Sequence, residues 1–99
     1  MRMLMKVSVP VAEGNLGIKE GTFPKTVMNF IDHFNPEASY FVAEGGQRTA
    51  YFFFNAKEVS DIPSFAEPFF MNLNAKIELT PAMNVHDMQT GIEKAMKHK

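Results

Sequence analysis

The sequence predicts an α+β fold in which helices pack against a four-stranded antiparallel sheet. The main reason is the segment 37–55, EASYFVAEGGQRTAYFFFN, where two strand-like runs meet at Gly45-Gly46. Such a glycine pair is typical of a two-residue hairpin turn, because glycine adopts positive φ without a Cβ clash. The second reason is the order of apolar patterns along the chain, which is strand, helix, strand, strand, helix, strand and a final helix.

The first strand is expected within residues 1–9, where apolar side chains alternate between two faces and a proline follows. The segment 11–21 contains three glycines, and we expect it to form a loop. A glycine-rich loop that leads into a helix could also seat an anion, although its spacing matches no phosphate-binding motif.

Two helices are expected to pack on the sheet. The first begins around Pro24, which suits a first helical turn, and the Asn-Pro pair at 35–36 stops it. The second begins near Ser60 or Asp61, either of which could cap it. Pro68 should kink this helix or end it early, because proline lacks the backbone N–H that would bond to the preceding turn.

The last strand is expected at residues 74–80, where Pro81 ends it, as is natural at a sheet edge. Asn84 is expected to cap a final helix, with Asp87 in the first turn. One side of that helix is apolar, and it consists of Val85, Met88, Ile92, Ala95 and Met96.

The hairpin residues can be paired about the two-residue turn. This pairing sets Tyr40 opposite Tyr51 on one face, whereas Phe41, Phe52 and Phe54 lie on the other. A sheet with one face in water usually alternates apolar and polar residues, yet both faces here carry large rings. We therefore expect something to cover each face.

This element order and the doubly aromatic hairpin resemble the ferredoxin-like fold, and specifically the dimeric α+β-barrel proteins, including small uncharacterised bacterial members. The resemblance covers most of residues 2–82. It implies a single domain over residues 1–99, a βαββαβ order with an extra C-terminal helix, and strand order 4-1-3-2. It also implies a homodimer in which two sheets meet through their helix-free faces.

If helices cover the more apolar face, that face holds Met3, Met5, Val7, Phe41, Ala43, Ala50, Phe52, Phe54, Ile77 and Leu79. The helix-free face then gathers Leu4, Lys6, Ser8, Tyr40, Val42, Thr49, Tyr51, Phe53, Lys76 and Glu78. Apolar walls with a few polar groups are typical of small-molecule pockets. The candidate ligand-binding residues are therefore Lys6, Tyr40, Tyr51 and Glu78. The alternatives are cross-strand packing for the tyrosines and an ordinary ion pair for the charged residues.

The function expected from these features is that of a homodimer that binds a small, partly apolar or aromatic molecule in the cleft between its sheets. One alternative is a cofactor-independent monooxygenase or isomerase-type enzyme, in which a polar group of the cleft moves a proton. A second alternative is a purely structural or interaction module, in which the sheets pack without a cavity. No catalytic signature in the sequence selects among them.

Composition excludes several other classes. The net charge is −1 at pH 7, which argues against a nucleic-acid partner. The absence of cysteine excludes disulfides and thiolate ligands, and the three histidines form no metal-binding pattern, so neither metal nor cofactor is expected. The apolar start is too short for a signal peptide core, and no long apolar run follows, which predicts a cytoplasmic protein without a membrane partner.

Overall fold

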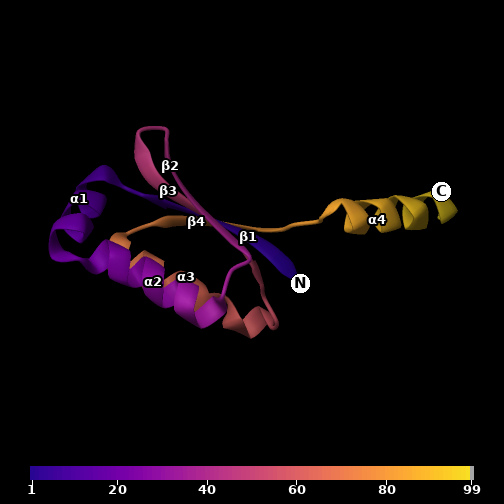
Figure 1. Ribbon diagram of the computed structural model, residues 1–99, viewed down its shortest axis with the longest axis horizontal. Coiled ribbons are helices and arrows are strands. Elements are labelled where there is room, and N and C mark those ends of the chain that lie inside the picture. Colours follow the sequence, from indigo (N-terminus) through magenta and orange to yellow (C-terminus); the bar gives the residue numbers. More distant parts are fainter. Residues whose placement is uncertain (99) are drawn as a thin grey trace.

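The computed structural model describes residues 1–98 of the chain. Figure 1 shows a four-stranded sheet with three helices on one side and a fourth helix that projects from the body. The elements are β1 (Arg2–Val9), α1 (Val11–Glu20), α2 (Thr22–Phe34), β2 (Ala38–Glu44), β3 (Gln47–Asn55), a 3-10 turn η1 (Val59–Asp61), α3 (Ile62–Leu73), β4 (Lys76–Pro81) and α4 (Val85–Lys97).

All neighbouring strands of the sheet are antiparallel, in the order β2-β3-β1-β4. This is the expected order 4-1-3-2, read from the other edge. The hairpin register is also confirmed, since Tyr40 pairs with Tyr51 and Glu44 with Gln47. Gly45 and Gly46 have φ values of 60° and 76°, and positive φ at both positions is what a type I′ hairpin turn requires.

The core lies between the sheet and the helices, and phenylalanine rings fill much of it. The ring of Phe30 from α2 lies 4.6 Å from that of Phe52 and 5.2 Å from that of Phe54, both on β3. From α3, Phe69 and Phe65 complete the cluster, with Phe65 4.9 Å from Phe54. Full burial of such a side chain stabilises a fold by about 1.5–3 kcal/mol, so this cluster fixes which sheet face the helices cover.

The prediction of a loop at residues 11–21 is wrong, because this segment forms helix α1. Gly14 and Gly17 are buried in it, and a Cβ on Gly17 would lie 3.1 Å from the side chains of both Leu73 and Phe23. These glycines let the helix approach its neighbours closely. Gly21 then ends α1 in the left-handed conformation, with φ of 81°. The anion-binding loop suggested for this segment is therefore not formed.

Of the two outcomes expected at Pro68, a kink or an early end, the early end is wrong, because α3 continues to Leu73. An internal proline costs a helix about 3 kcal/mol. Continuation buries Phe69 and Leu73, each 1% exposed, and this burial offsets the cost. Asp61 takes the N-cap position, but its side chain makes no capping hydrogen bond.

The helical layer does not cover β2, contrary to expectation. Phe41 was assigned to the helix-covered face, and it remains 53% exposed although its ring packs on Phe52 at 5.9 Å. Ala43 is exposed as well. The rest of the assigned apolar face is buried or packed against the core.

Helix α4 begins as expected at Asn84. The Asn84 side chain accepts a hydrogen bond from the Asp87 backbone N–H at 2.8 Å, and the Asp87 carboxylate accepts one from the Asn84 backbone N–H at 3.0 Å. This reciprocal pair is a capping box. The helix projects from the body along the longest axis (Figure 1), and none of its described residues is buried.

We predict that Gly17→Ala destabilises the fold by about 1 kcal/mol. Overpacking typically costs about 1–3 kcal/mol, and the better helix propensity of alanine returns only part of this. Chemical denaturation followed by circular dichroism measures the change. The matched control is Gly91→Ala in α4, where an added Cβ meets nothing within 4 Å and should not destabilise. Equal stabilities for Gly17→Ala and the wild type would contradict the packing role of Gly17.

Candidate functional site

The four candidate residues form one continuous row across the helix-free face of the sheet. Tyr40 on β2 pairs with Tyr51 on β3, Tyr51 pairs with Lys6 on β1, and Lys6 pairs with Glu78 on β4. Antiparallel partners point to the same face, so the side chains of all four strands contribute to one surface.

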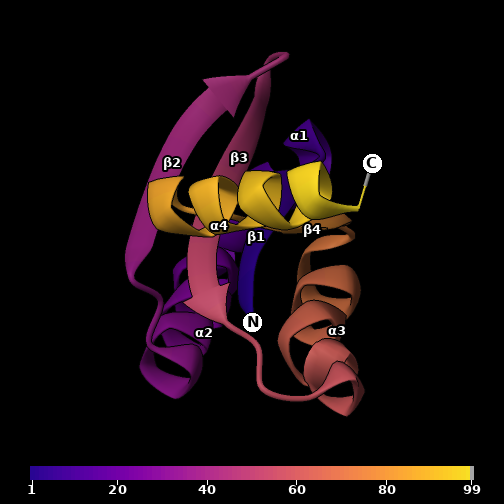
Figure 2. The same cartoon turned by 90° about the vertical axis from the view of Figure 1, so that its right-hand side faces the viewer.

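The row lies on an open surface. Tyr40 is 62% exposed and Val42 is 45% exposed, while Leu4, Lys6 and Tyr51 nearer the middle of the sheet are half-buried. Helices α2 and α3 pack on the opposite face of the sheet, where the buried side chains of β1 and β3 point, and Figure 2 shows α4 crossing in front of the sheet. Within the described chain, these residues therefore form an open surface and not an enclosed pocket.

Glu44 at the end of β2 joins the row through its side chain. Its two carboxylate oxygens bind different groups, since Oε2 pairs with the Lys6 ammonium and Oε1 accepts a hydrogen bond from the Tyr51 hydroxyl. Lys6 Nζ also lies 3.7 Å from the Glu78 carboxylate and 5.9 Å from the centre of the Tyr51 ring. An ammonium and a phenol thus converge on one carboxylate.

These contacts hold the three groups in their usual protonation states at neutral pH. The hydrogen bond with Glu44 raises the pKa of Lys6, and the same bond lowers the pKa of Glu44. Donation to the Glu44 carboxylate raises the pKa of Tyr51 above 10.0. The site accordingly presents two hydrogen-bond donors, an ammonium and a phenolic O–H, and neither is a free base.

The sequence did not indicate the role of Glu44. The register places it opposite Gln47, four residues along β2 from Tyr40, which is about 13 Å of strand. Glu44 contacts Lys6 and Tyr51 only because these three long side chains extend toward one another. The usable signal was that Glu44 is an acidic residue on the same face as Lys6.

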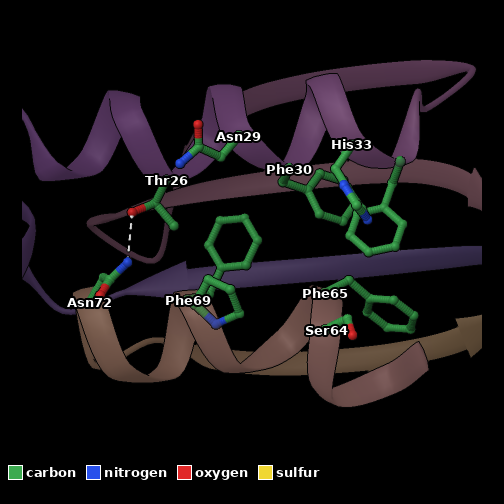
Figure 3. A pocket seen from close by; sticks show the side chains of 10 residues that line it. Thr26, Asn29, Phe30, His33, Ser64, Phe65, Phe69 and Asn72 are labelled. Atoms are coloured by element: carbon green, nitrogen blue, oxygen red, sulfur yellow. Dashed lines mark hydrogen bonds between the residues drawn. The ribbon is translucent and has the colours of Figure 1, made fainter. Parts of the chain in front are cut away.

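A second candidate site, which the sequence did not predict, lies between α2 and α3. Figure 3 shows side chains of the two helices facing each other across a groove, with phenyl rings between them. This cavity measures about 430 Å³. The polar groups that line it are Thr26, Asn29, His33, Ser64 and Asn72, and the apolar ones are Phe30, Phe34, Phe65, Pro68 and Phe69.

A hydrogen bond closes one part of this groove. Asn72 Nδ2 donates to Thr26 Oγ1 at 3.2 Å, and the Thr26 hydroxyl donates to the Thr22 carbonyl at 2.7 Å (Figure 3). His33 lies toward the other part, with its ring 4.7 Å from that of Phe34. Apart from the imidazole of His33, the lining has no ionisable side chain, so the groove suits an uncharged molecule.

Within residues 1–98, no group of three or more histidine, aspartate or glutamate side chains is arranged to hold a metal ion. None of the helices in that range has the length and apolar character needed to cross a membrane. Comparison of the sequence with models of known families and with curated proteins found no significant match. The function is therefore inferred from the geometry of the chain.

We predict that the phenol of Tyr51 titrates above 10.0 and that Glu44→Gln moves this titration down. The Glu44 carboxylate accepts a hydrogen bond from the phenol and so favours its protonated form. When this carboxylate is removed, the positive charge of Lys6 remains and favours the phenolate. The chain has two tyrosines and no tryptophan, so ultraviolet titration of the Tyr40→Phe variant reports Tyr51 alone. Circular dichroism at each pH checks that the fold persists. An unchanged titration in Glu44→Gln would contradict the contact.

Proposed function

We propose that this chain is a ferredoxin-like, dimeric α+β-barrel protein that binds a small, partly apolar or aromatic molecule between the sheets of a homodimer. The observation that carries the proposal is the row of Tyr40, Tyr51, Lys6 and Glu78 across the sheet face opposite α2 and α3. The strand order supports the fold assignment.

A second copy is the natural cover for this face. Tyr40 and Val42 expose rings and methyl groups there, and Phe53 and Leu4 pair in the next row of the same face. A domain of about 100 residues buries roughly two thirds of the surface of its unfolded chain, so additional apolar burial is a substantial gain. Two-fold symmetry allows the same face to serve on both copies.

The ligand class follows from the chemistry of the face. Rings and methyl groups would form the walls, and the Lys6 ammonium and Tyr51 hydroxyl would supply the few directed polar contacts. Both donors now bind the Glu44 carboxylate. A carbonyl or carboxylate oxygen on an aromatic ligand could take its place, since Glu44 lies beside the glycine turn and its side chain is 44% exposed.

Binding is a better description than the cofactor-independent oxidation or isomerisation considered above. A general base must be deprotonated near neutral pH. The contacts with Glu44 raise the pKa of both Lys6 and Tyr51, which is the direction opposite to that requirement. The Glu44 carboxylate is deprotonated, but its lowered pKa makes it a weak base, and its two oxygens are bound to Lys6 and Tyr51.

The groove between α2 and α3 is a second candidate binding site. Its volume of about 430 Å³ lies within the usual range for small-molecule pockets, about 300–1,000 Å³. It needs no second copy, and its amide-rich lining favours an uncharged ligand rather than an acidic one.

We predict that the protein is a dimer in solution, with a mass twice the 11.2 kDa of one chain by light scattering. Tyr40→Glu should shift it toward the monomer, because the introduced charges would lie buried at the interface. Tyr40 is exposed in the single chain, so its replacement should leave the fold itself intact. A wild-type monomer at all concentrations up to about 100 µM, a concentration at which even micromolar association would show, would exclude the proposed dimer.

We also predict that the stabilisation of the protein by aryl carboxylates or phenols, measured by thermal shift, is lost in Tyr51→Phe. The phenolic O–H is one of the two donors of the site, and each shift is taken relative to the same variant without ligand. Asn29→Ala in the helix groove is the matched control. Loss in Asn29→Ala but not in Tyr51→Phe would assign the ligand to the groove instead.

A further inference from the structure

Helix α4 carries an apolar side that the rest of residues 1–98 leaves exposed. Met88 is 44% exposed, Ile92 53% and Met96 54%, and they follow one another at helical spacing. Isolated helices shorter than about 12–15 residues are marginal in water. At 13 residues, α4 therefore needs a surface to pack on.

The start of α4 is held at the end of the sheet remote from the hairpin turn. Arg2 on β1 donates to the Asp87 carboxylate at 2.9 Å and to that of Glu37, which precedes β2, at 2.8 Å. The Ala82 backbone N–H also bonds to the Arg2 carbonyl at 3.0 Å. Because the capping box fixes the first turn as well, the direction in which α4 leaves the sheet is defined.

A bare apolar hollow lies at the opposite end of the strands, beside the hairpin turn. It measures about 390 Å³ and is lined by Phe23, Phe41, Val42, Ala43, Arg48 and Thr49. Phe41, Ala43 and Arg48 belong to the helix-covered side, where α1, α2 and α3 leave this part of the sheet open and Phe41 exposed. Val42 and Thr49, which pair on the opposite face, complete the lining at this edge. Helix α4 points away from the hairpin that carries this hollow, so α4 does not fill it in its own chain (Figure 1).

The start of α4 and the hollow lie at opposite ends of the strands. Strand β4 ends beside Met3, at the strand end remote from the Gly45-Gly46 turn, and α4 follows from there. One common class of face-to-face sheets keeps the strands of the two sheets within about 30° of each other. A two-fold axis that runs between the sheets and across the strands reverses the strand direction, so it sets the α4 end of each copy over the hairpin end of the other.

We propose that α4 is an exchanged arm, whose apolar side docks in the Phe41 hollow of a second copy of this chain. The inference rests on the proposed sheet-face dimer and adds the element that locks it. Each copy then gives one helix and receives one, so that the arm extends the partner's helical layer over its β2 strand.

The areas support an arm as part of the interface. The sheet face alone projects about 500 Å², from four strands about 4.8 Å apart and about 26 Å long. A stable interface buries about 800 Å² on each partner. One side of a 13-residue helix adds about 200 Å², and each copy buries one such side and one such hollow. The sheet face with both arm contacts therefore reaches about 900 Å² on each copy.

Cysteine cross-linking tests the exchange directly, because the natural chain has no cysteine. We expect an Ile92→Cys chain mixed with a Phe41→Cys chain to give an oxidised heterodimer on a non-reducing gel. Lys94→Cys, on the opposite side of α4, is the matched control and should give much less. In the Ile92→Cys, Phe41→Cys double variant, an internal disulfide within a monomer would overturn the proposal in favour of folding back in the same chain.

A second measurement does not depend on disulfide geometry. The Met88→Gln, Ile92→Gln double variant should raise the dimer dissociation constant at least about 100-fold, while Lys94→Gln should not. Light scattering over a dilution series measures both. If the wild type is dimeric and the double variant is equally so, the exchanged arm is wrong and the sheet-face dimer stands. If the wild type is monomeric, the proposed function fails as well.

Discussion

The pleat of β3 is the constraint on which the rest of the molecule depends. Successive residues of this strand alternate between two faces, so Phe52 and Phe54 enter the core while Tyr51 and Phe53 turn to the opposite side. A shift of one residue in its register would exchange the two sets. The hairpin turn at Gly45-Gly46 prevents that shift, because it fixes the pairing of β3 with β2.

The side chains on the two faces of β3 are covered in different ways. On the core side, phenyl rings from α2 and α3 surround Phe52 and Phe54, so that these rings are buried within one chain. On the other side, the Tyr51 ring lies beneath the Lys6 ammonium, and an ion-pair and hydrogen-bond network through Glu44 replaces hydrophobic cover. Tyr40 and Val42 remain exposed on that second face in the described chain, and the proposed dimer would cover them.

Several apolar surfaces of the chain are exposed. The open sheet face, the exposed side of α4 and the hollow beside Phe41 are separate apolar surfaces of one small chain. Arg2 connects two of them, because it ties the start of α4 to the sheet through Asp87. A two-fold assembly would cover all of them at once, whereas a closed monomer would have to leave at least the sheet face exposed.

Much of the fold follows from local rules that sequence alone provides. Alternation gave the strands, the glycine pair gave the register of the hairpin, and the Asn84 and Asp87 pair gave the start of α4. The same register placed Tyr40 and Tyr51 on one face, whereas Lys6 and Glu78 were placed beside them through the strand order that the ferredoxin-like resemblance implies. These predictions succeed because period, turn and cap depend on neighbours within a few residues.

Only the tertiary structure decided the remaining features. Gly14 and Gly17 look like loop residues until Leu73 and Phe23 pack against α1, and Pro68 looks like a helix end until Phe69 is buried. The reach of Glu44 and the limit of the helical layer at β2 likewise depend on residues distant in sequence. Each of these features depends both on a local conformational preference and on burial or charge pairing between residues distant in sequence. The local sequence pattern reports only the conformational preference.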